Sequence, residues 1–216
     1  MRVYHFLAAR WAEDDLTRRR LKVSRFDDLN DPFELLALEL RDREVRRAFQ
    51  EMRQHVAERR GVLCFSCKWW NPLLWSHYGD KHRGACLGFD IPDKFIAKVH
   101  YDAKRLPDIV EDVIGGGPEA VALVTRLLAT KFQDWKYEDE VRVYCDLEVQ
   151  HRDAGFYFRN FDESLVLAEV ILGPRYSGSK ATVLKLACSF GNKVDVVQAR
   201  LAFRSFRVVK DKRGVV

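Results

Sequence analysis

The order of strand-like and helix-like segments most constrains the fold of this 216-residue chain. Short apolar runs are typical of β-strands, whereas apolar residues three and four apart are typical of helices. We therefore expect strands over residues 2–7, 21–24, 62–66, 85–90, 140–149, 155–161 and 165–172, with one or two more over 194–209. We expect helices over residues 10–20, 33–60, 118–132 and 177–190, and a helix or helical turn over 71–82. Because no βαβ rhythm repeats, the pattern favours an α+β fold over a doubly wound parallel sheet.

Glycine and proline mark the borders of these segments. Asn30-Asp31-Pro32 is predicted to form a turn in which Asp31 caps the following helix, and Gly61 is predicted to end that helix. The run Gly115–Gly117 precedes a helix but lacks the lysine and the hydroxyl of a phosphate-binding loop. No connection is long enough to divide the chain, so we predict one domain over 1–216, with basic closing strands and a tail over 194–216.

Composition and charge narrow the class of protein. Apolar residues make up 47% of the chain and charged residues 32%, which is typical of a folded, soluble protein. No run approaches the roughly 20 apolar residues that cross a bilayer, and the N-terminus turns acidic too early for a secretory signal. We therefore expect a cytoplasmic protein with no membrane partner. The net charge is +5, and basic residues concentrate at 18–25 and 204–213. These clusters indicate either a nucleic acid partner or solvated faces and tails.

The five cysteines are an odd number scattered through apolar segments, and we expect them to be mostly reduced core residues. Cys64 and Cys67, followed by His77 and His82, could together form a zinc site. Their spacing is shorter than that of common zinc fingers, and a second Cys-x-x-Cys is missing. The alternative is that Cys64 faces the core within a strand, and we expect no metal.

Polar and aromatic side chains concentrate in four stretches of the chain. They are residues 3–7, 29–34, 64–66 with 71–79, and 135–142. Alternate residues of a strand share a face, so Glu138 and Glu140 are predicted to point the same way, with Arg142 next in the row. Two carboxylates on one face suggest proton transfer, metal binding or stabilisation of a cation. The alternative is an exposed strand end that pairs with Arg142 and Lys136 and contributes little to stability.

The other residues of these stretches also have structural interpretations. His5 could be a satisfied core or edge histidine. Trp75 and Trp135 could be core residues rather than platforms for a ligand. Asn30 and Asp31 could form no more than a turn and a helix cap.

Taken in order, these stretches resemble an uncharacterised bacterial family, the domain of unknown function numbered twenty-nine seventy-one. The resemblance rests on the motifs LNDPFE (29–34), CFS (64–66), WSHYG (75–79) and WKYEDEVR (135–142). It covers residues 4–173 and implies no particular activity. Cys67 lies outside the family pattern, which weakens the zinc interpretation further.

More distantly, the chain resembles the ADP-ribosyltransferases, which share a split α+β sheet. In that family a basic residue or histidine on an early strand precedes a hydroxyl residue on a middle strand and a glutamate pair on a later one. His5, Ser66 and Glu138-x-Glu140 follow in this order. The resemblance implies one domain with a mixed or split, antiparallel-rich sheet flanked by helices.

The same resemblance implies roles for individual residues. His5 would hold the adenine-side ribose of NAD, and Ser66 would line the nicotinamide pocket. Glu140 would bind the nicotinamide ribose, and Glu138 would orient or deprotonate the acceptor. Candidates for further contacts with the cofactor are Trp75, His77 and Tyr78, and further polar candidates are Asn30, Asp31 and Arg142.

We therefore expect an NAD-dependent, ADP-ribosyltransferase-like enzyme of a bacterial defence or toxin system, with NAD as cosubstrate and a nucleic acid or protein as acceptor. One alternative is a metal-dependent nuclease or phosphoesterase. Its ligands would come from Asp31, Glu34, His77, His82, Glu138 and Glu140. The other is a non-catalytic module that binds a ligand or a nucleic acid in a groove lined by Trp75, His77 and Tyr78.

Overall fold

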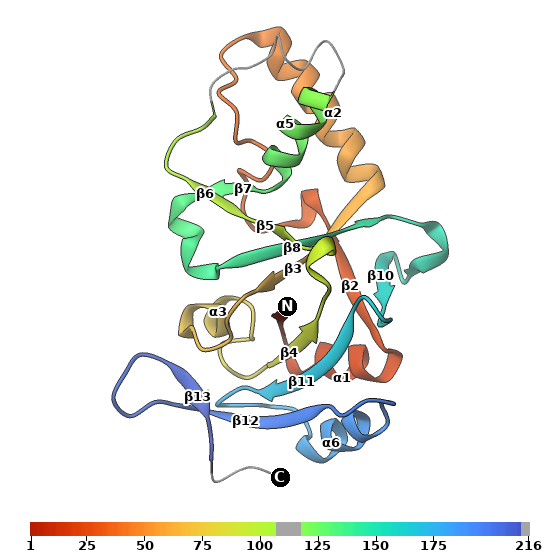
Figure 1. Ribbon diagram of the computed structural model, residues 1–216, viewed down its shortest axis with the longest axis vertical. Helices are drawn as coiled ribbons and strands as arrows, with labels where there is room; N and C mark the ends of the chain where they lie inside the picture. Colours follow the sequence, from red (N-terminus) through yellow and green to blue (C-terminus); the bar gives the residue numbers. More distant parts are fainter. Residues whose placement is uncertain (107–117, 213–216) are drawn as a thin grey trace.

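The computed structural model describes residues 1–106 and 118–212, and it has an α+β fold with a large mixed sheet (Figure 1). The strands are β1 (Arg2–Leu7), β2 (Arg20–Arg25), β3 (Arg60–Ser66), β4 (Ala85–Asp90), β5 (Ala97–Lys98), β6 (His100–Asp102), β7 (Thr130–Phe132), β8 (Glu140–Asp146), β9 (Arg152–Asp153), β10 (Phe156–Asn160), β11 (Val166–Leu172), β12 (Asp195–Leu201) and β13 (Val208–Lys210). The helices are α1 (Ala9–Arg18), α2 (Arg43–Arg59), α3 (Pro72–His77), α5 (Pro118–Leu128) and α6 (Lys180–Cys188), with short 3-10 helices η1 (Phe26–Asp28), η2 (Asp93–Phe95), η3 (Gln133–Glu138) and η4 (Val149–His151). The turn predicted at Gly115–Gly117 lies outside the described residues. Within them, no helix has the length and apolar content of a membrane span.

The order of the strands places β1, β3 and β8 next to one another. The main path is β13-β12-β11-β4-β1-β3-β2-β10-β9, and β8 pairs with both β3 and β5. Neighbours in this sheet are antiparallel, apart from the parallel pair β11 and β12. The register of β3 with β8 runs from Arg60↔Asp146 to Ser66↔Glu140. This ladder places Glu140 directly opposite Ser66.

The sheet divides at β3. This strand pairs with β1 at Tyr4↔Ser66 and with β2 at Ser24↔Val62 and Arg25↔Gly61. Among the described residues β1 and β3 form no other register pair, because β1 and β2 lie beside opposite ends of β3. The division leaves room for side chains from β1, β2 and β3 to face a common space.

The two faces of the sheet carry separate apolar cores. Alternation along β1 sends Val3 and Leu7 to one face and Phe6 to the other. The first face packs against α1 and α6, and the second packs against α3. Trp75 of α3 is fully buried there, edge-on to Phe6 with ring centroids 5.1 Å apart.

A third apolar cluster joins α2 to α5 at one end of the molecule (Figure 1). Phe49 of α2 packs there with Leu123 and Leu127 of α5. Below this cluster β6 and β7 form a parallel pair, in which Tyr101 lies opposite Lys131. β7 therefore carries a lysine toward the large sheet.

Two predicted helices are shorter than expected. The helix expected over 33–60 begins only at Arg43, because the side chain of Asp42 accepts hydrogen bonds from amides of the first turn at 2.7 and 3.1 Å. The helix expected over 118–132 ends at Leu128, and β7 follows it. Glu34 and Lys131 therefore lie outside helices, and both belong to the site described below.

We predict that Gly84 tolerates no side chain. A Cβ at this position would overlap the carbonyl oxygen of Leu7 and would lie 3.0 Å from that of Gly79. Overpacking costs about 1–3 kcal/mol, so Gly84→Ala should lower the melting temperature by roughly 3–10 °C. Gly191→Ala is the matched control, because its Cβ would meet nothing within 4 Å. Equal melting curves by circular dichroism would contradict the close packing at this corner.

Candidate functional site

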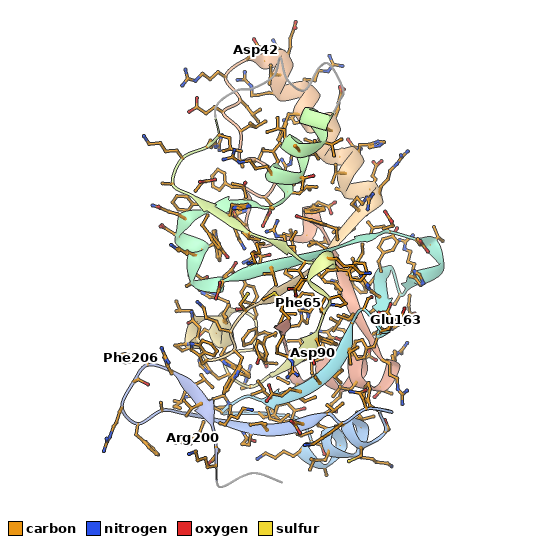
Figure 2. The ribbon with its side chains drawn as sticks, in the orientation of Figure 1. Asp42, Phe65, Asp90, Glu163, Arg200 and Phe206 are labelled. Atoms are coloured by element: carbon orange, nitrogen blue, oxygen red, sulfur yellow. The ribbon has the colours of Figure 1, made fainter. Side chains whose placement is uncertain are left out.

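A cavity of about 250 Å³ lies where the sheet divides. β1, β2 and β3 line it, and residues near the end of α3 and the start of β8 add polar groups. Phe65 of β3, which also lines the cavity, lies in the middle of the molecule (Figure 2). Six residues that the sequence predicts as site residues face the cavity: His5, Asn30, Ser66, Tyr78, Glu138 and Glu140. Distant parts of the chain therefore meet around one hollow.

The two glutamates meet at one buried lysine. Glu138 ends η3 and Glu140 begins β8, and Asp139 between them has left-handed backbone geometry with φ of 48°. The Nζ of Lys131 donates to Oε2 of Glu138 at 2.6 Å and to Oε2 of Glu140 at 3.2 Å. The glutamates are only 4% and 6% exposed. Of the alternative of an exposed strand end paired with Arg142 and Lys136, the exposure is therefore wrong, whereas Glu140 does pair with Arg142.

Arg142 extends this network to Glu34. Its Nε donates to Oε1 of Glu140 at 2.8 Å, and its terminal nitrogens donate to the two oxygens of Glu34 at 2.5 and 3.0 Å. A further hydrogen bond of 2.6 Å reaches the carbonyl of Leu128. Arg142 is fully buried, and a charge removed from water needs partners of this kind.

The charges of this buried cluster, formed by Glu34, Lys131, Glu138, Glu140 and Arg142, do not cancel. With every group ionised, the three carboxylates of Glu34, Glu138 and Glu140 face the two cations of Lys131 and Arg142, which leaves a formal charge of −1.

The pKa values of the two paired glutamates shift in opposite directions. Burial raises the pKa of Glu138 above its ordinary value, by more than Lys131 and the Tyr78 hydroxyl lower it. Burial also favours the neutral form of Glu140, but Arg142 and Lys131 outweigh it, so the pKa of Glu140 is lowered. A carboxyl that takes up a proton readily therefore lies beside one that stays ionised.

Tyr78 connects Glu138 to the surface. Its hydroxyl donates to Oε1 of Glu138 at 2.5 Å and accepts a hydrogen bond from Nδ2 of Asn30 at 2.9 Å. Burial and the negative charge of Glu138 raise the pKa of Tyr78 far above its ordinary value, so the hydroxyl keeps its proton. Because Asn30 is exposed, this chain of hydrogen bonds leads from solvent to a buried carboxyl.

His5 presents a hydrogen-bond acceptor to the cavity. Its Nδ1 lies 2.9 Å from the carbonyl oxygen of Cys64, which can only accept, so Nδ1 carries a proton. Burial lowers the pKa of His5, which keeps the ring neutral. The lone pair of Nε2 is therefore free of a proton and suits a hydroxyl donor.

Ser66 holds the glutamate pair against the sheet. Its Oγ donates to the carbonyl oxygen of Glu138 at 2.5 Å and accepts from the backbone N–H of Lys68 at 3.2 Å. Ser66 lines the cavity, but its hydroxyl is engaged with the backbone. Its contribution is therefore to position Glu138.

Four predicted site residues do not line the cavity: Arg142, described above, and Trp75, His77 and Asp31. Trp75 is enclosed in the core, and its indole N–H donates to the carbonyl of Trp69 at 2.6 Å, so a ligand in the cavity cannot stack on it. His77 is exposed at the end of α3. Asp31 is buried and accepts from the N–H of Phe33 at 2.9 Å, which makes it a turn residue rather than the cap of a long helix.

Of the residues considered for metal binding, Glu34, Glu138 and Glu140 meet around Lys131 and Arg142 rather than around an open metal position. Within residues 1–106 and 118–212, no group of three or more His, Cys, Asp or Glu side chains is arranged to hold a metal ion. Burial raises the pKa of Cys64 and of Cys67, which opposes formation of a thiolate. His82 instead stacks on Trp75, with ring centroids 6.5 Å apart.

Lys131 is the site residue that sequence reasoning missed. It was placed within a helix, whereas β7 directs it to the two glutamates and to within 4.8 Å of the ring centroid of Trp135. The local signal is a single lysine among the apolar neighbours of Ala129–Phe132. Such a pattern also fits an exposed strand, so it does not reveal which carboxylates the lysine binds.

No protein-family model matches this chain, and no curated protein or solved structure matches it significantly. The two family resemblances therefore remain predictions.

We predict that the buried arginine is essential to stability. Arg142→Met would leave Glu34 and Glu140 buried without their main cation, and breaking such a pair costs about 3–5 kcal/mol. Urea denaturation measures the loss. The double variant Glu34→Gln/Arg142→Met should recover part of it, because one stranded charge is removed.

Arg47→Met is the matched control for this prediction. Arg47 pairs with Glu51 at 3.2 Å on the exposed face of α2, and such pairs contribute at most about 1 kcal/mol. If Arg142→Met were as stable as Arg47→Met, the buried network would not contribute to stability as predicted.

Proposed function

We propose that this protein has an ADP-ribosyltransferase-like fold and transfers ADP-ribose from NAD to an acceptor nucleophile. The observation that carries the proposal is the convergence of His5, Ser66, Glu138 and Glu140 on one cavity. The strands β1, β3 and β8, which bear or border these residues, are adjacent in the sheet. The family resemblance assigns a histidine, a hydroxyl and a glutamate pair to an early, a middle and a later strand, so this adjacency supports the proposal.

In the proposed reaction the glycosidic bond between C1′ of the ribose and the nicotinamide nitrogen breaks. The bonding electrons leave with nicotinamide, which departs as a neutral molecule, and positive charge develops on the ribose. In the same step a new bond forms between C1′ and an oxygen or nitrogen of the acceptor or of water, and this attacking group loses its proton to Glu138. Atoms and charge balance without a further cofactor.

Glu140 is suited to stabilise the ribosyl cation. Its lowered pKa keeps it ionised, and it faces the cavity. Two unit charges 4 Å apart attract by about 4 kcal/mol at an effective dielectric constant of 20. Because Arg142 and Lys131 share the charge of Glu140, its own contribution is smaller than that value.

Glu138 is suited to accept the acceptor's proton. Its raised pKa makes it a stronger base than an ordinary glutamate, and Lys131 and Tyr78 fix both of its oxygens. The hydroxyl of Tyr78 is itself held by Asn30, so the orientation of Glu138 is fixed from the surface inward.

The dimensions of the cavity suggest how a dinucleotide would lie. At about 250 Å³ the cavity is slightly smaller than typical ligand pockets of roughly 300–1,000 Å³, so it has room for one end of NAD. The unprotonated Nε2 of His5 can accept a hydrogen bond from a ribose hydroxyl. Lys22 is exposed at the edge of the cavity, where it can bind a phosphate of the part of NAD that stays outside.

We predict that the protein releases nicotinamide from NAD and that Glu138→Gln slows this release. Loss of a positioned base typically costs a factor of about 10²–10⁴, and chromatography of free nicotinamide measures the rate. NAD should also raise the melting temperature of the wild-type protein. Glu163→Gln is the matched control, because Glu163 is an exposed carboxylate remote from the cavity (Figure 2). A Glu138→Gln variant that is folded and as fast as wild type would eliminate the assigned role.

We also predict that nicotinamide release rises with pH. As a base, Glu138 acts only when ionised, and its pKa lies above the ordinary glutamate value of 4.5. The rate should therefore increase as the pH passes upward through this raised pKa, in a series from roughly pH 4 to pH 9 at constant ionic strength. Glu138→Gln should lose this rise, and a flat wild-type profile would contradict the prediction.

A further inference from the structure

The loop between β12 and β13 holds two phenylalanines in solvent at the end of the molecule opposite α2 (Figures 1 and 2). Phe203 is 85% exposed and Phe206 is 97% exposed. The base of the loop is fixed, because the N–H of Ala202 donates to the carbonyl of Arg207 at 2.9 Å and Leu201 pairs with Val208 in the hairpin. Large apolar rings held in water by an ordered loop indicate a surface for a partner.

The charge of this segment has one sign. Every charged residue between Asp195 and Asp211 is basic, and these residues are Arg200, Arg204, Arg207 and Lys210. The side chains of Arg204 and Arg207 are exposed, and neither has an ion-pair or hydrogen-bond partner within the part of the chain that the structure describes. Their guanidinium groups are therefore available to an anionic partner.

The aromatic rings lie close to these cations. The guanidinium of Arg200 lies 4.6 Å from the ring centroid of Phe203, so one face of that ring is engaged and the other is open. The carbonyl of Trp70 accepts from the N–H of Val208 at 2.9 Å, and the side chain of Trp70 is 38% exposed. Residues 200–207 thus form an aromatic and cationic surface, and the backbone of Trp70 supports its base.

We propose that this surface binds single-stranded nucleic acid. Unpaired bases stack on exposed aromatic side chains, and free guanidinium groups bind phosphates. Arg204 and Ser205 separate Phe203 from Phe206. Cationic and aromatic side chains therefore alternate along the loop, as phosphates and bases alternate along a single strand of nucleic acid. The proposal is independent of the chemistry in the cavity.

The same features argue against two other anionic partners. A loop that enters a membrane interface presents apolar residues at its tip, whereas here an arginine and a serine lie between the two rings. A double helix keeps its bases stacked inside, so it offers phosphates to Arg204 and Arg207 but no base to the phenylalanines.

Fluorescence anisotropy with the full chain and a labelled oligonucleotide of mixed sequence, about 12 nucleotides long, tests the proposal. Phe203→Ala and Phe206→Ala should each weaken binding by roughly tenfold or more, since both rings are exposed and their removal spares the core. Arg204→Gln should lower the slope of log affinity against log salt by about 1. Phe95→Ala is the matched control, because Phe95 is also exposed and has the ammonium of Lys94 4.9 Å from its ring centroid.

Three results would overturn the inference. The first is that the oligonucleotide does not bind as proposed: either the wild-type protein fails to bind it, or both phenylalanine variants bind it with unchanged affinity. The second is equally tight binding to a duplex of the same sequence, which would show that stacking plays no part. The third is cosedimentation with phosphatidylserine vesicles that Phe206→Ala abolishes, without any binding of the oligonucleotide, which would assign the surface to a membrane.

Discussion

The guanidinium of Arg142 is the group on which the arrangement of this protein depends most. A fully buried cation destabilises a fold unless carboxylates surround it, and here they come from Glu34 and Glu140. To satisfy Arg142 the chain must bring the segment before α2, the end of α5 and the start of β8 to one point. One buried side chain therefore links the α2–α5 end of the molecule to the main sheet.

The same network prepares the candidate site. Two cations, Arg142 and Lys131, bind Glu140 and stabilise its ionised form. Glu138 binds one cation, Lys131, and accepts its other hydrogen bond from the neutral phenol of Tyr78. Two glutamates two residues apart thereby acquire opposite protonation tendencies. Groups that stabilise the fold thus also set the pKa values of the candidate site, so mutations in this cluster are expected to change stability and the charge of the site together.

Local sequence patterns predict the strands of this protein well and its buried charges poorly. Alternation identifies β1 and the start of β8, and short apolar runs identify β3 and β4, because the side chains of these strands are largely buried. Alternation also predicts that Glu140 and Arg142 share a side. Helix ends are less secure, since the helix predicted from residue 33 starts only after Asp42.

The reason for that failure is long-range. Glu34 is a good helix former, but its contact with Arg142, 108 positions along the chain, holds it in irregular structure. Lys131 was missed for the same reason, since nothing within a few residues of it indicates that its partners are two glutamates. Burial of Trp75 likewise depends on Phe6, which no local pattern connects to it.

The division of the sheet at β3 has a mechanical consequence. β1 is joined to β4 by six register pairs and β3 to β8 by seven, but among the described residues β1 and β3 share the single register pair Tyr4↔Ser66. The two ladders thus form stiff slabs on either side of a narrow seam, and the cavity lies along that seam. A change in the width of this hollow would disturb one register pair and leave both long ladders intact, so the seam is where the sheet can adjust to a guest at the smallest cost in hydrogen bonds.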